Sequence, residues 1–578
     1  MLTGSAMDLY SIVQYGLFLA IVTVMVKPLG GYMERVFSGK KTVLDWFCVP
    51  IERLIYRVTA IDPTVEMTAP QYAISFVLFS VAGTLLLYCV LRLQNFLPWF
   101  FPKYLTTPLS PDLALNTAIS FSTTTTWQAY GGENTMSYFS QMAGLCAQNF
   151  LAGAAGLAIG IAFIRGFARQ LSKTLGNFWV DTTRALLWIL LPGALAGAVF
   201  LVWQGVPMNF QHYMTATSLE GSKQVIPQGP VAALEFIKNL GTNGGGFFNA
   251  NGAHPYENPT PLTNFMEMLA IVLLPAALTN TFGRMIRQPR QGWLLYIVMI
   301  ILFATGLMSV HLLEQAGNPH LGGVDHRQSA FQAGGNMEGK EVRFGIAGST
   351  LTAVVTSNTA TGSNNSMHDS YSSFGGLVLL TNLLLGELVF GGLGTGIYSM
   401  VMAAAIALFL AGLMVGRTPE YLGKKIGPAE NKLIILYALA APVVILSLTA
   451  IAISTKAGLA GLTTNSGPHG LSEILFAYSS CFANNGQSFA GLSANSVFYN
   501  LTTALAMMAG RFGLAIPALA CAGLFARQRN TPSSVGTLRT DGLTFGIFLI
   551  VCLIVVTALS YLPSLVLGPV LEHLLVGI

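Results

Sequence analysis

Ten long apolar segments constrain the fold of this sequence more than any other feature. A stretch of ~20 apolar residues is long enough to cross a bilayer as an α-helix. Only 9% of the residues are charged, against ~25% in soluble domains, and the mean hydropathy is +0.60. The sequence therefore predicts an all-α polytopic membrane protein and excludes a cytosolic enzyme, a disordered chain and a nucleic-acid binder. The segments lie near residues 9–30, 71–93, 137–164, 182–203, 263–283, 292–313, 371–416, 434–455, 498–526 and 543–568.

The seventh segment is too long for one straight helix. Its middle reads Glu387-Leu-Val-Phe-Gly-Gly-Leu-Gly-Thr-Gly396. Each glycine inside a helix costs ~1 kcal/mol relative to alanine, so clustered glycines predict a break near the centre of the membrane. We expect ten crossings, one of them broken, and keep eleven crossings as the alternative.

Basic residues predict the orientation of these crossings. Most of the 29 Lys and Arg residues lie in five connections, at 31–70, 165–184, 284–291, 417–432 and 527–540. Cytoplasmic loops carry an excess of Lys and Arg, so these connections are expected inside and the N-terminus outside. The first segment has no basic residue before it and no small-x-small cleavage site after it, which predicts a retained helix rather than a signal peptide.

Four loops on the opposite side share one pattern, a short apolar stretch followed by small polar residues. With Thr124, Gly244, Gly362 and Gly486 as markers, the intervals are 120, 118 and 124 residues. Near-constant spacing indicates an internal repeat, and the repeats are parallel because every such loop is on the same side. One such loop alone would be interpreted as an ordinary turn.

The composition of the four clusters predicts a pathway for a monovalent cation. Irregular backbone at membrane depth is tolerated only where it lines a cavity or is buried in protein. Glycine allows close approach of the backbone, and carbonyl and hydroxyl oxygens replace the hydration shell of an ion. Because the clusters hold no Asp or Glu, we expect selectivity for a weakly hydrated ion such as potassium.

Two of the charged residues inside apolar segments, Arg511 and Glu387, are candidates for a role in ion transport. Arg511 is in the middle of the ninth segment, where its insertion costs ~2.5–3.5 kcal/mol, and Glu387 is beside the glycine break. One interpretation is a buried Arg–Glu pair that ties two helices together. The other places the guanidinium below the filter as a barrier to leakage, with Glu387 along the exit path. Both interpretations stay open.

Three motifs that would indicate a metal, redox or nucleotide site are absent from the sequence. The sequence contains no H-E-x-x-H, no C-x-x-C and no G-x-x-x-x-G-K-[ST]. It also has no soluble region large enough for an ATPase domain. We expect a chain that is not an enzyme and binds no nucleotide, so another chain would have to hydrolyse ATP if ATP drives transport.

Several motifs in combination resemble the potassium-transporting A subunits of bacterial Kdp-type ATP-driven potassium uptake complexes. They cover most of the chain and are specific as a set. These motifs are Asn239–Ala250, His254–Thr260, Met367–Ser370, Gly386-Glu387, Phe390–Gly392, Gly412–Lys425, Ser488–Asn495 and Gly510–Gly513.

The resemblance implies a potassium-channel-like fold of four fused M-P-M units (membrane helix, pore helix, membrane helix) around a central pore. It divides the chain into an N-terminal helix and loop, four units and a C-terminal helix. The corresponding ranges are 1–65, 66–180, 181–290, 291–430 (with the broken second helix), 431–530 and 531–578.

The resemblance also implies the site. Potassium is expected at a four-loop filter, Arg511 is the charge below it, Glu387 is the acid on the ion path, and Arg417 lies near the partner interface. Two strands depart from the family pattern, since the first has four consecutive threonines and the third reads Ala-Thr-Gly. The filter residues are Thr123, Thr124, Thr125, Asn243, Gly244, Thr361, Gly362, Asn485 and Gly486, with Gln128 flanking them.

The implied function is the potassium-selecting subunit of a high-affinity import complex in the bacterial inner membrane. The implied partners are a P-type ATPase subunit (B), which hydrolyses ATP, an accessory subunit (C), a small single-helix subunit (F) and membrane lipid. The transported potassium ion is the only ligand expected. A stand-alone channel or cation symporter of the related superfamily is the alternative, and a membrane scaffold without an ion path is a third hypothesis.

Overall fold

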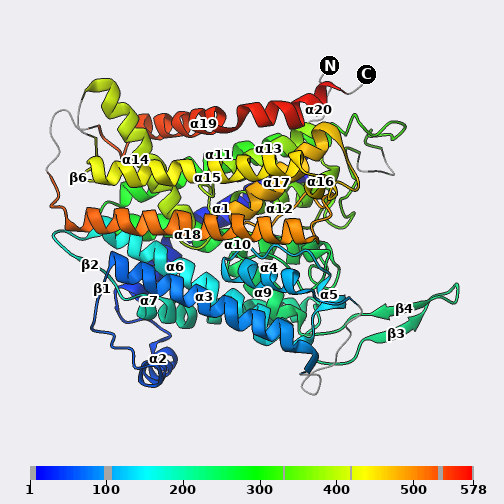
Figure 1. Ribbon diagram of the computed structural model, residues 1–578, viewed down its shortest axis with the longest axis horizontal. Coiled ribbons are helices and arrows are strands. Elements are labelled where there is room, and N and C mark those ends of the chain that lie inside the picture. The colour runs from blue at the N-terminus through cyan, green and yellow to red at the C-terminus, as the bar shows by residue number, and fades with distance from the viewer. Residues whose placement is uncertain are drawn as a thin grey trace.

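The computed structural model describes residues 8–96, 107–329, 332, 334–416, 419–531 and 538–575. Most of these residues are helical, and the long helices run side by side along the longest axis of the molecule (Figure 1). Ten described helical runs are long and apolar enough to cross a membrane, which confirms the predicted number. These runs are α1 (Leu9–Phe37), α3 (Ala69–Leu93) with η1 (Gln94–Phe96), the π-helical η2 (Ser140–Cys146) with α6 (Ala147–Ala168), α7 (Phe178–Arg184) with η3 (Ala185–Leu190) and α8 (Leu191–Trp203), α10 (Pro261–Met285), α11 (Pro289–Gln315), α14 (Thr395–Val415), α15 (Pro428–Ser454), α18 (Val497–Arg527), and α19 (Leu543–Leu565) with η6 (Val566–Val570) and α20 (Leu571–Leu574).

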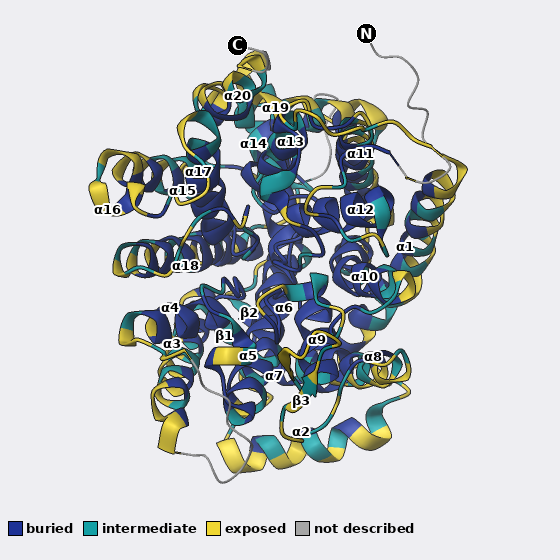
Figure 2. Cartoon of the chain, turned by 90° about the vertical axis from the view of Figure 1, so that its right-hand side faces the viewer, coloured by how far each residue is buried: buried dark blue, intermediate teal, exposed yellow. Residues whose placement is uncertain are grey.

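Four short helices precede the four polar clusters. They lie in the right half of Figure 1, and the view from that end shows them arranged around the middle of the molecule (Figure 2). Most of their side chains are buried, since the long helices surround them. The four are α4 (Pro111–Ser122), α9 (Val231–Leu240), α12 (Gly345–Asn358) and α17 (Gly467–Phe482).

The seventh predicted crossing is broken, as expected from its glycines. Ten residues separate the end of α13 (Ser373–Leu384) from the start of α14 at Thr395, and Glu387 among them has a φ of 56°. Gly394 has a φ of 93°, and a Cβ there would collide with the carbonyl oxygen of Gly156 in α6. Glycine at position 394 therefore allows the break to lie directly against α6.

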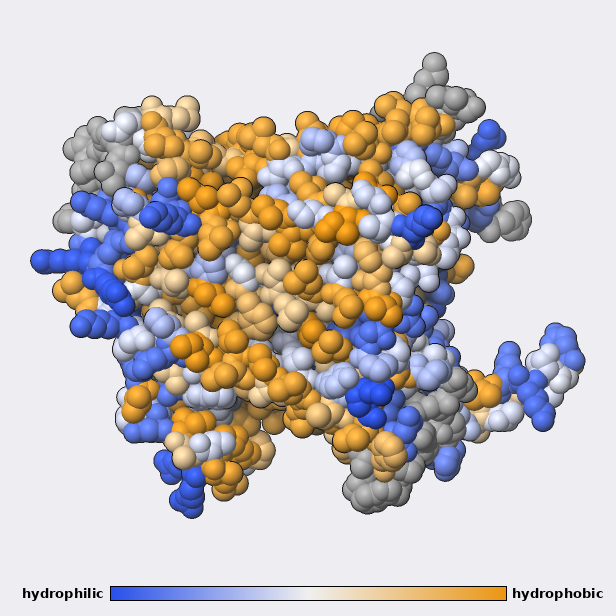
Figure 3. All heavy atoms as spheres, in the orientation of Figure 1, coloured by the Kyte–Doolittle hydropathy of each residue, from blue (hydrophilic) through white to orange (hydrophobic). Residues whose placement is uncertain are grey.

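The surface divides into an apolar belt and two polar ends. Figure 3 shows mainly hydrophobic residues across the middle of the molecule and hydrophilic residues at both ends of its long axis. Such a belt is what a lipid environment requires of a helical bundle. The end drawn left in Figure 1 holds α2 (Asp45–Thr59), β1 (Met67–Thr68), β2 (Thr174–Gly176), β5 (Glu420–Tyr421) and β6 (Lys424–Lys425). The opposite end holds α5 (Gly132–Thr135), the hairpin of β3 (Met214–Thr217) and β4 (Lys223–Ile226), and α16 (Lys456–Leu459). Two short 3₁₀ helices, η4 (Asn251–Ala253) and η5 (His368–Ser370), follow the second and third polar clusters in the sequence.

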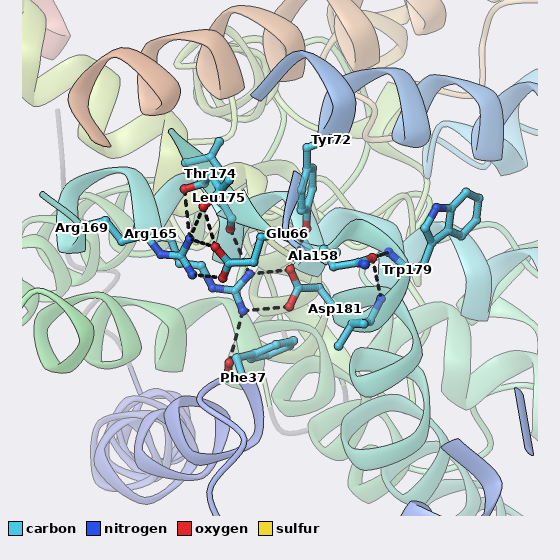
Figure 4. A network of polar contacts seen from close by, with 12 residues as sticks. Phe37, Glu66, Tyr72, Ala158, Arg165, Arg169, Thr174, Leu175, Trp179 and Asp181 are labelled. Atoms are coloured by element: carbon cyan, nitrogen blue, oxygen red, sulfur yellow. Dashed lines mark hydrogen bonds and ion pairs between the residues drawn. The ribbon is translucent and has the colours of Figure 1, made fainter. Parts of the chain in front are cut away.

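A buried ion pair holds the first helices together at the left end (Figure 4). Arg165 of α6 donates from Nη2 to Oδ1 of Asp181 in α7 across 2.8 Å. The hydroxyl of Tyr72 in α3 donates to Oδ2 of the same carboxylate at 3.0 Å. Arg169 forms a second ion pair with Glu66 at 2.6 Å, next to the β1–β2 ladder. Three helices thus share one charged network.

Candidate functional site

The four segments that follow the short helices have the same backbone hydrogen bonds. In each unit, the backbone N–H of the first residue after the helix donates to the carbonyl four residues earlier in the chain. Two residues further on, a second N–H donates to the carbonyl five residues earlier than itself, and this bond is present in at least three units. The first set is Thr123 to Ile119, Gly241 to Ile237, Thr359 to Val355 and Ala483 to Ser479. The second set is Thr125 to Ser120, Asn243 to Lys238 and Asn485 to Ser480. The sequence repeat is therefore a repeat of backbone geometry.

These hydrogen bonds fix the register between the units. Thr126 has a φ of 48°, as its counterparts Gly244 (91°) and Gly486 (88°) also have positive φ. Thr126, and not the predicted marker Thr124, is thus the counterpart of Gly244. Gly362 occupies the same position in the third unit but is not among the residues with positive φ. The first segment has four consecutive threonines and no glycine, so composition alone does not mark this position. The interval of 118 residues between Gly244 and Gly362 would have located it, because the same interval before Gly244 leads to Thr126.

The segments meet in a closed ring that follows chain order. Thr126 donates from Oγ1 to the carbonyl of Asn243, and Gly245 N donates to the carbonyl of Gly362 at 3.4 Å. A Cβ on Gly362 would be 2.6 Å from the carbonyl carbon of Gly486, and a Cβ on Gly486 would collide with the carbonyl oxygen of Thr125. We define the ring as residues 125–126, 243–244, 361–362 and 485–486.

The side chains at the first position of each ring segment are buried in the surrounding scaffold. Those of Thr125, Asn243, Thr361 and Asn485 are all fully buried. Asn485 donates to the carbonyl of Thr356 at 2.6 Å, and Thr361 donates to the carbonyl of Thr359 at 2.8 Å. The groups that approach one another between neighbouring segments are mainly backbone groups.

A cavity of about 790 Å³ adjoins the ring, and we call it the vestibule. Thr126, Gln128 and Gly486 line it together with the loop residues Asn251 and Lys340. The predicted flanking residue Gln128 clamps two segments, because its Oε1 accepts from Gly246 N at 2.9 Å and its Nε2 donates to Gly246 O at 3.0 Å. The vestibule therefore borders the first and fourth ring segments directly.

Arg511 contacts the first segment directly. Its Nη1 donates to Oγ1 of Thr124 at 3.1 Å and its Nη2 donates to the carbonyl of Ala152 at 3.2 Å. The guanidinium is also 5.4 Å from the ring centroid of Phe76. Among the described residues, the ion pairs do not include a direct one between Arg511 and Glu387, although the two charges interact across a longer distance.

Glu387 lies in the break between α13 and α14 with 5% of its surface exposed. It borders a mainly apolar cavity of about 110 Å³, which also reaches Tyr437 and Phe482. Further along the same break, Leu393 N donates to Oγ1 of Thr242 at 2.9 Å, so the break lies against the base of the second segment. Arg417, the predicted interface residue, lies outside the described residues.

A buried ion pair beneath the second segment was missed by the sequence reasoning. Lys238 Nζ is 2.7 Å from Oε2 of Glu235, both side chains are fully buried, and Nζ also donates to Asn251 at 2.8 Å. The backbone carbonyl of Lys238 accepts from Asn243 and Gly244. A Glu and a Lys three residues apart in an otherwise apolar short helix were the available signal.

The loop after the second segment holds a neutral histidine. The imidazole of His254 stacks on Phe248 with 3.8 Å between ring centroids, and its Nδ1 accepts from Tyr256 N at 3.1 Å. Burial, with a smaller contribution from the charge of Arg343, lowers the pKa of His254 to about 4.

Comparisons with known proteins identify the family. A family model described as "Potassium-transporting ATPase A subunit" matches residues 16–574. A protein of Methylorubrum extorquens is 52% identical over 567 residues, which cover 98% of each chain. A protein of Koribacter versatilis is 50% identical over 575 residues, 96% of this chain and 97% of the relative. Both relatives are named potassium-transporting ATPase potassium-binding subunit.

A solved structure supports the fold. The potassium transporter TrkH from Vibrio parahaemolyticus superposes with a TM-score of 0.50 at 13% identity, covering 88% of this chain and 97% of that one. At this identity the likeness concerns the fold alone. Taken with the match to the family model over nearly the whole chain, these findings show that the chain belongs to the family of potassium-transporting ATPase A subunits.

Proposed function

We propose that this chain is the potassium-selecting, ion-translocating subunit of an ATP-driven high-affinity potassium import complex. The observation that carries the proposal is the closed ring of four backbone segments beside the vestibule, in a member of this family. No Asp or Glu lies in the ring segments, and neutral oxygens suit a weakly hydrated monovalent cation.

In this proposal the ring and the predicted filter residues bind potassium from the vestibule, and Thr126 joins Thr123, Thr124 and Thr125 in the first segment. Arg511 supplies fixed positive charge at the base of that segment, which opposes free leakage of cations. Glu387 offsets this charge along the exit path. The contact between Leu393 and Thr242 supports a path that passes the helix break.

The ATP-hydrolysing step belongs in this proposal to a P-type ATPase partner, while this chain performs no catalysis and binds no nucleotide. The complex would also contain an accessory subunit and a small single-helix subunit. We place the chain in the bacterial inner membrane with its N-terminus outside, and we retain the division into four M-P-M units with one extra helix at each end. Lys and Arg residues concentrated in five connections support this orientation.

The test is uptake of potassium into liposomes. We expect the complete complex to import potassium only with ATP, and the chain alone to give no sustained flux. The alternative, a stand-alone channel or symporter, draws on the likeness of fold to TrkH. Flux through the chain alone at a rate that ATP and partner subunits leave unchanged would support that alternative and contradict the proposal.

A further inference from the structure

A cluster of one histidine and three carboxylates joins elements that are distant in the sequence. Asp369 lies in η5, after the third ring segment; His469 and Glu473 lie in the first turns of α17; and Glu572 lies in α20. One potential ligand atom from each of Asp369, His469 and Glu473 lies within 4.8 Å of the others. The contacts described above for the ring, the vestibule and the helix break involve none of these four side chains.

The imidazole of His469 has a carboxylate on each side. Its Nε2 is 2.8 Å from Oδ1 of Asp369, and its Nδ1 is 3.1 Å from Oε1 of Glu572. A metal-binding histidine characteristically uses one ring nitrogen for the metal and donates the other N–H to a carboxylate, which fixes the tautomer and the ring orientation. Glu572 is placed to be that second carboxylate.

Glu473 gives an independent indication of a ligand. Its side chain is buried with 1% exposed, and its Oε2 has no hydrogen-bond partner in the described part of the chain. Its Oε1 accepts from Asn465 at 2.8 Å. A buried carboxylate with an unpaired oxygen is costly unless a cation or a proton neutralises it, and a metal ion is the cation that this cluster could hold.

The carboxylates of Glu473 and Asp369 converge beside Gly491, which follows the fourth ring segment. A Cβ on Gly491 would be 2.5 Å from Oε1 of Glu473 and 2.8 Å from Oδ1 of Asp369. Glycine therefore leaves the space between the two carboxylates and the backbone free of side-chain atoms. Asp369, Glu473 and Glu572 surround the imidazole of His469, and His320 Nε2 lies 3.8 Å from Oε1 of Glu572 at the edge of the cluster.

We propose that Asp369, His469 and Glu473 form a binding site for a divalent transition-metal ion of the zinc class, with Glu572 orienting His469. Zinc readily takes three nitrogen and oxygen ligands with one water, whereas calcium and magnesium prefer all-oxygen sites of higher coordination number. The metal ion would take the place of the proton between His469 and Asp369.

The position of the site indicates what the metal would do. Asp369 N donates to the carbonyl of Phe489 at 2.8 Å, so the backbones that follow the third and fourth ring segments are already in contact there. A bound metal would cross-link these two backbones to α17 and, through Glu572, to α20. The metal would therefore stabilise the outer side of the ring, and this inference does not depend on the identity of the transported ion.

The experiment uses the full-length chain purified in detergent, stripped with a chelator and titrated with zinc chloride in a calorimeter. We expect one zinc ion per chain and a rise in the unfolding temperature on binding. E473Q and H469Q should each weaken binding at least ~10-fold, the scale expected for lost ligand-shell contacts. The controls are E220Q and H212Q, which alter exposed side chains on or near the β3–β4 hairpin and should bind zinc as the wild type does.

A further variant distinguishes a metal site from a network of ion pairs around a protonated His469. H469C retains a metal ligand but replaces imidazole with a softer thiolate, so it should bind cadmium more tightly than H469Q does. This comparison remains informative if H469Q or E473Q folds poorly. Three results would each overturn the proposal. They are a zinc dissociation constant above ~100 μM in the wild type, unchanged zinc binding in E473Q and H469Q, and no gain of cadmium affinity in H469C.

Discussion

Arg511 and Thr124 are joined by a hydrogen bond of 3.1 Å from Nη1 to Oγ1, which connects the middle of α18 to the base of the first ring segment. The charge of Arg511 is thus held next to the proposed ion path instead of being paired with Glu387. A guanidinium in this position raises the energy of a cation leaving the ring toward the exit.

Replacing Arg511 with methionine tests this electrostatic role. Methionine keeps much of the apolar stem, so assembly should survive, while the apparent potassium affinity of ATP-dependent uptake should change by ~10-fold or more. The double variant R511M/E387Q should keep the altered affinity, because the two side chains form no ion pair within the described structure. Recovery of both stability and normal uptake in the double variant would instead show that the two residues act as a structural pair.

Replacing Gly486 with alanine should raise the potassium concentration needed for half-maximal uptake by ~10-fold or more. Its φ of 88° is unfavourable for alanine, and the new Cβ would collide with the carbonyl oxygen of Thr125. G467A is the matched control, since Gly467 has a φ of 63° but nothing within 4 Å of an added Cβ. Equal effects of G486A and G467A on affinity would show that backbone strain, and not ring geometry, is responsible.

The register of the ring predicts an effect at Thr126. T126V keeps the shape of the side chain but removes the hydroxyl that donates to the carbonyl of Asn243. We expect weaker discrimination between potassium and sodium in competition uptake assays, with normal amounts of assembled protein. T117V is the control, because Thr117 also donates to a backbone carbonyl, that of Leu113 at 2.8 Å, but inside α4 and away from the ring. Unchanged selectivity in T126V would contradict the assignment of Thr126 to the ring.

The buried ion pair between Arg165 and Asp181 should contribute most to the stability of the end of the molecule that is drawn left in Figure 1. D181N leaves a buried guanidinium without its carboxylate, and such a change costs ~3–5 kcal/mol. The corresponding exposed pair is Arg539–Asp541, whose arginine side chain is 79% exposed, and D541N should cost ~0–1 kcal/mol. Thermal unfolding in detergent measures both. Similar small losses in the two variants would mean that water or other groups compensate for the missing charge.

His254 should make stability depend on pH. Its pKa is lowered from the usual 6.5 to about 4, so the unfolded chain binds the proton more readily than the folded chain does. Stability contributed by neutral His254 is therefore complete above pH ~6.5 and decreases as the pH falls toward 4. H254N retains an acceptor for Tyr256 N but does not titrate. The unfolding temperature should fall less between pH 7 and pH 5 in H254N than in the wild type; parallel curves would assign the pH dependence to other groups.

Hydropathy and glycine content were sufficient to predict the ten spans and the broken seventh crossing, because lipid requires long apolar helices and glycine interrupts them. The site was predicted less completely. The position of Thr126 was missed because the marker in the first segment was chosen by composition, whereas the interval of 118 residues between Gly244 and Gly362 leads back to Thr126. The pair Lys238–Glu235 was missed because burial of charge depends on neighbours that only the fold brings together. The contact of Arg511 with Thr124 joins residues 387 positions apart, and no local pattern predicts it.

The four ring segments come from one chain and follow its order, and their buried first positions are Thr125, Asn243, Thr361 and Asn485. Threonine and asparagine therefore alternate around the ring, which gives the side-chain shell two-fold symmetry around a backbone of approximate four-fold symmetry. In a channel of four identical subunits, one codon change alters all four quadrants at once. In this chain it alters one quadrant, so ion affinity can change in small steps, and each quadrant can diverge without forcing the other three to follow.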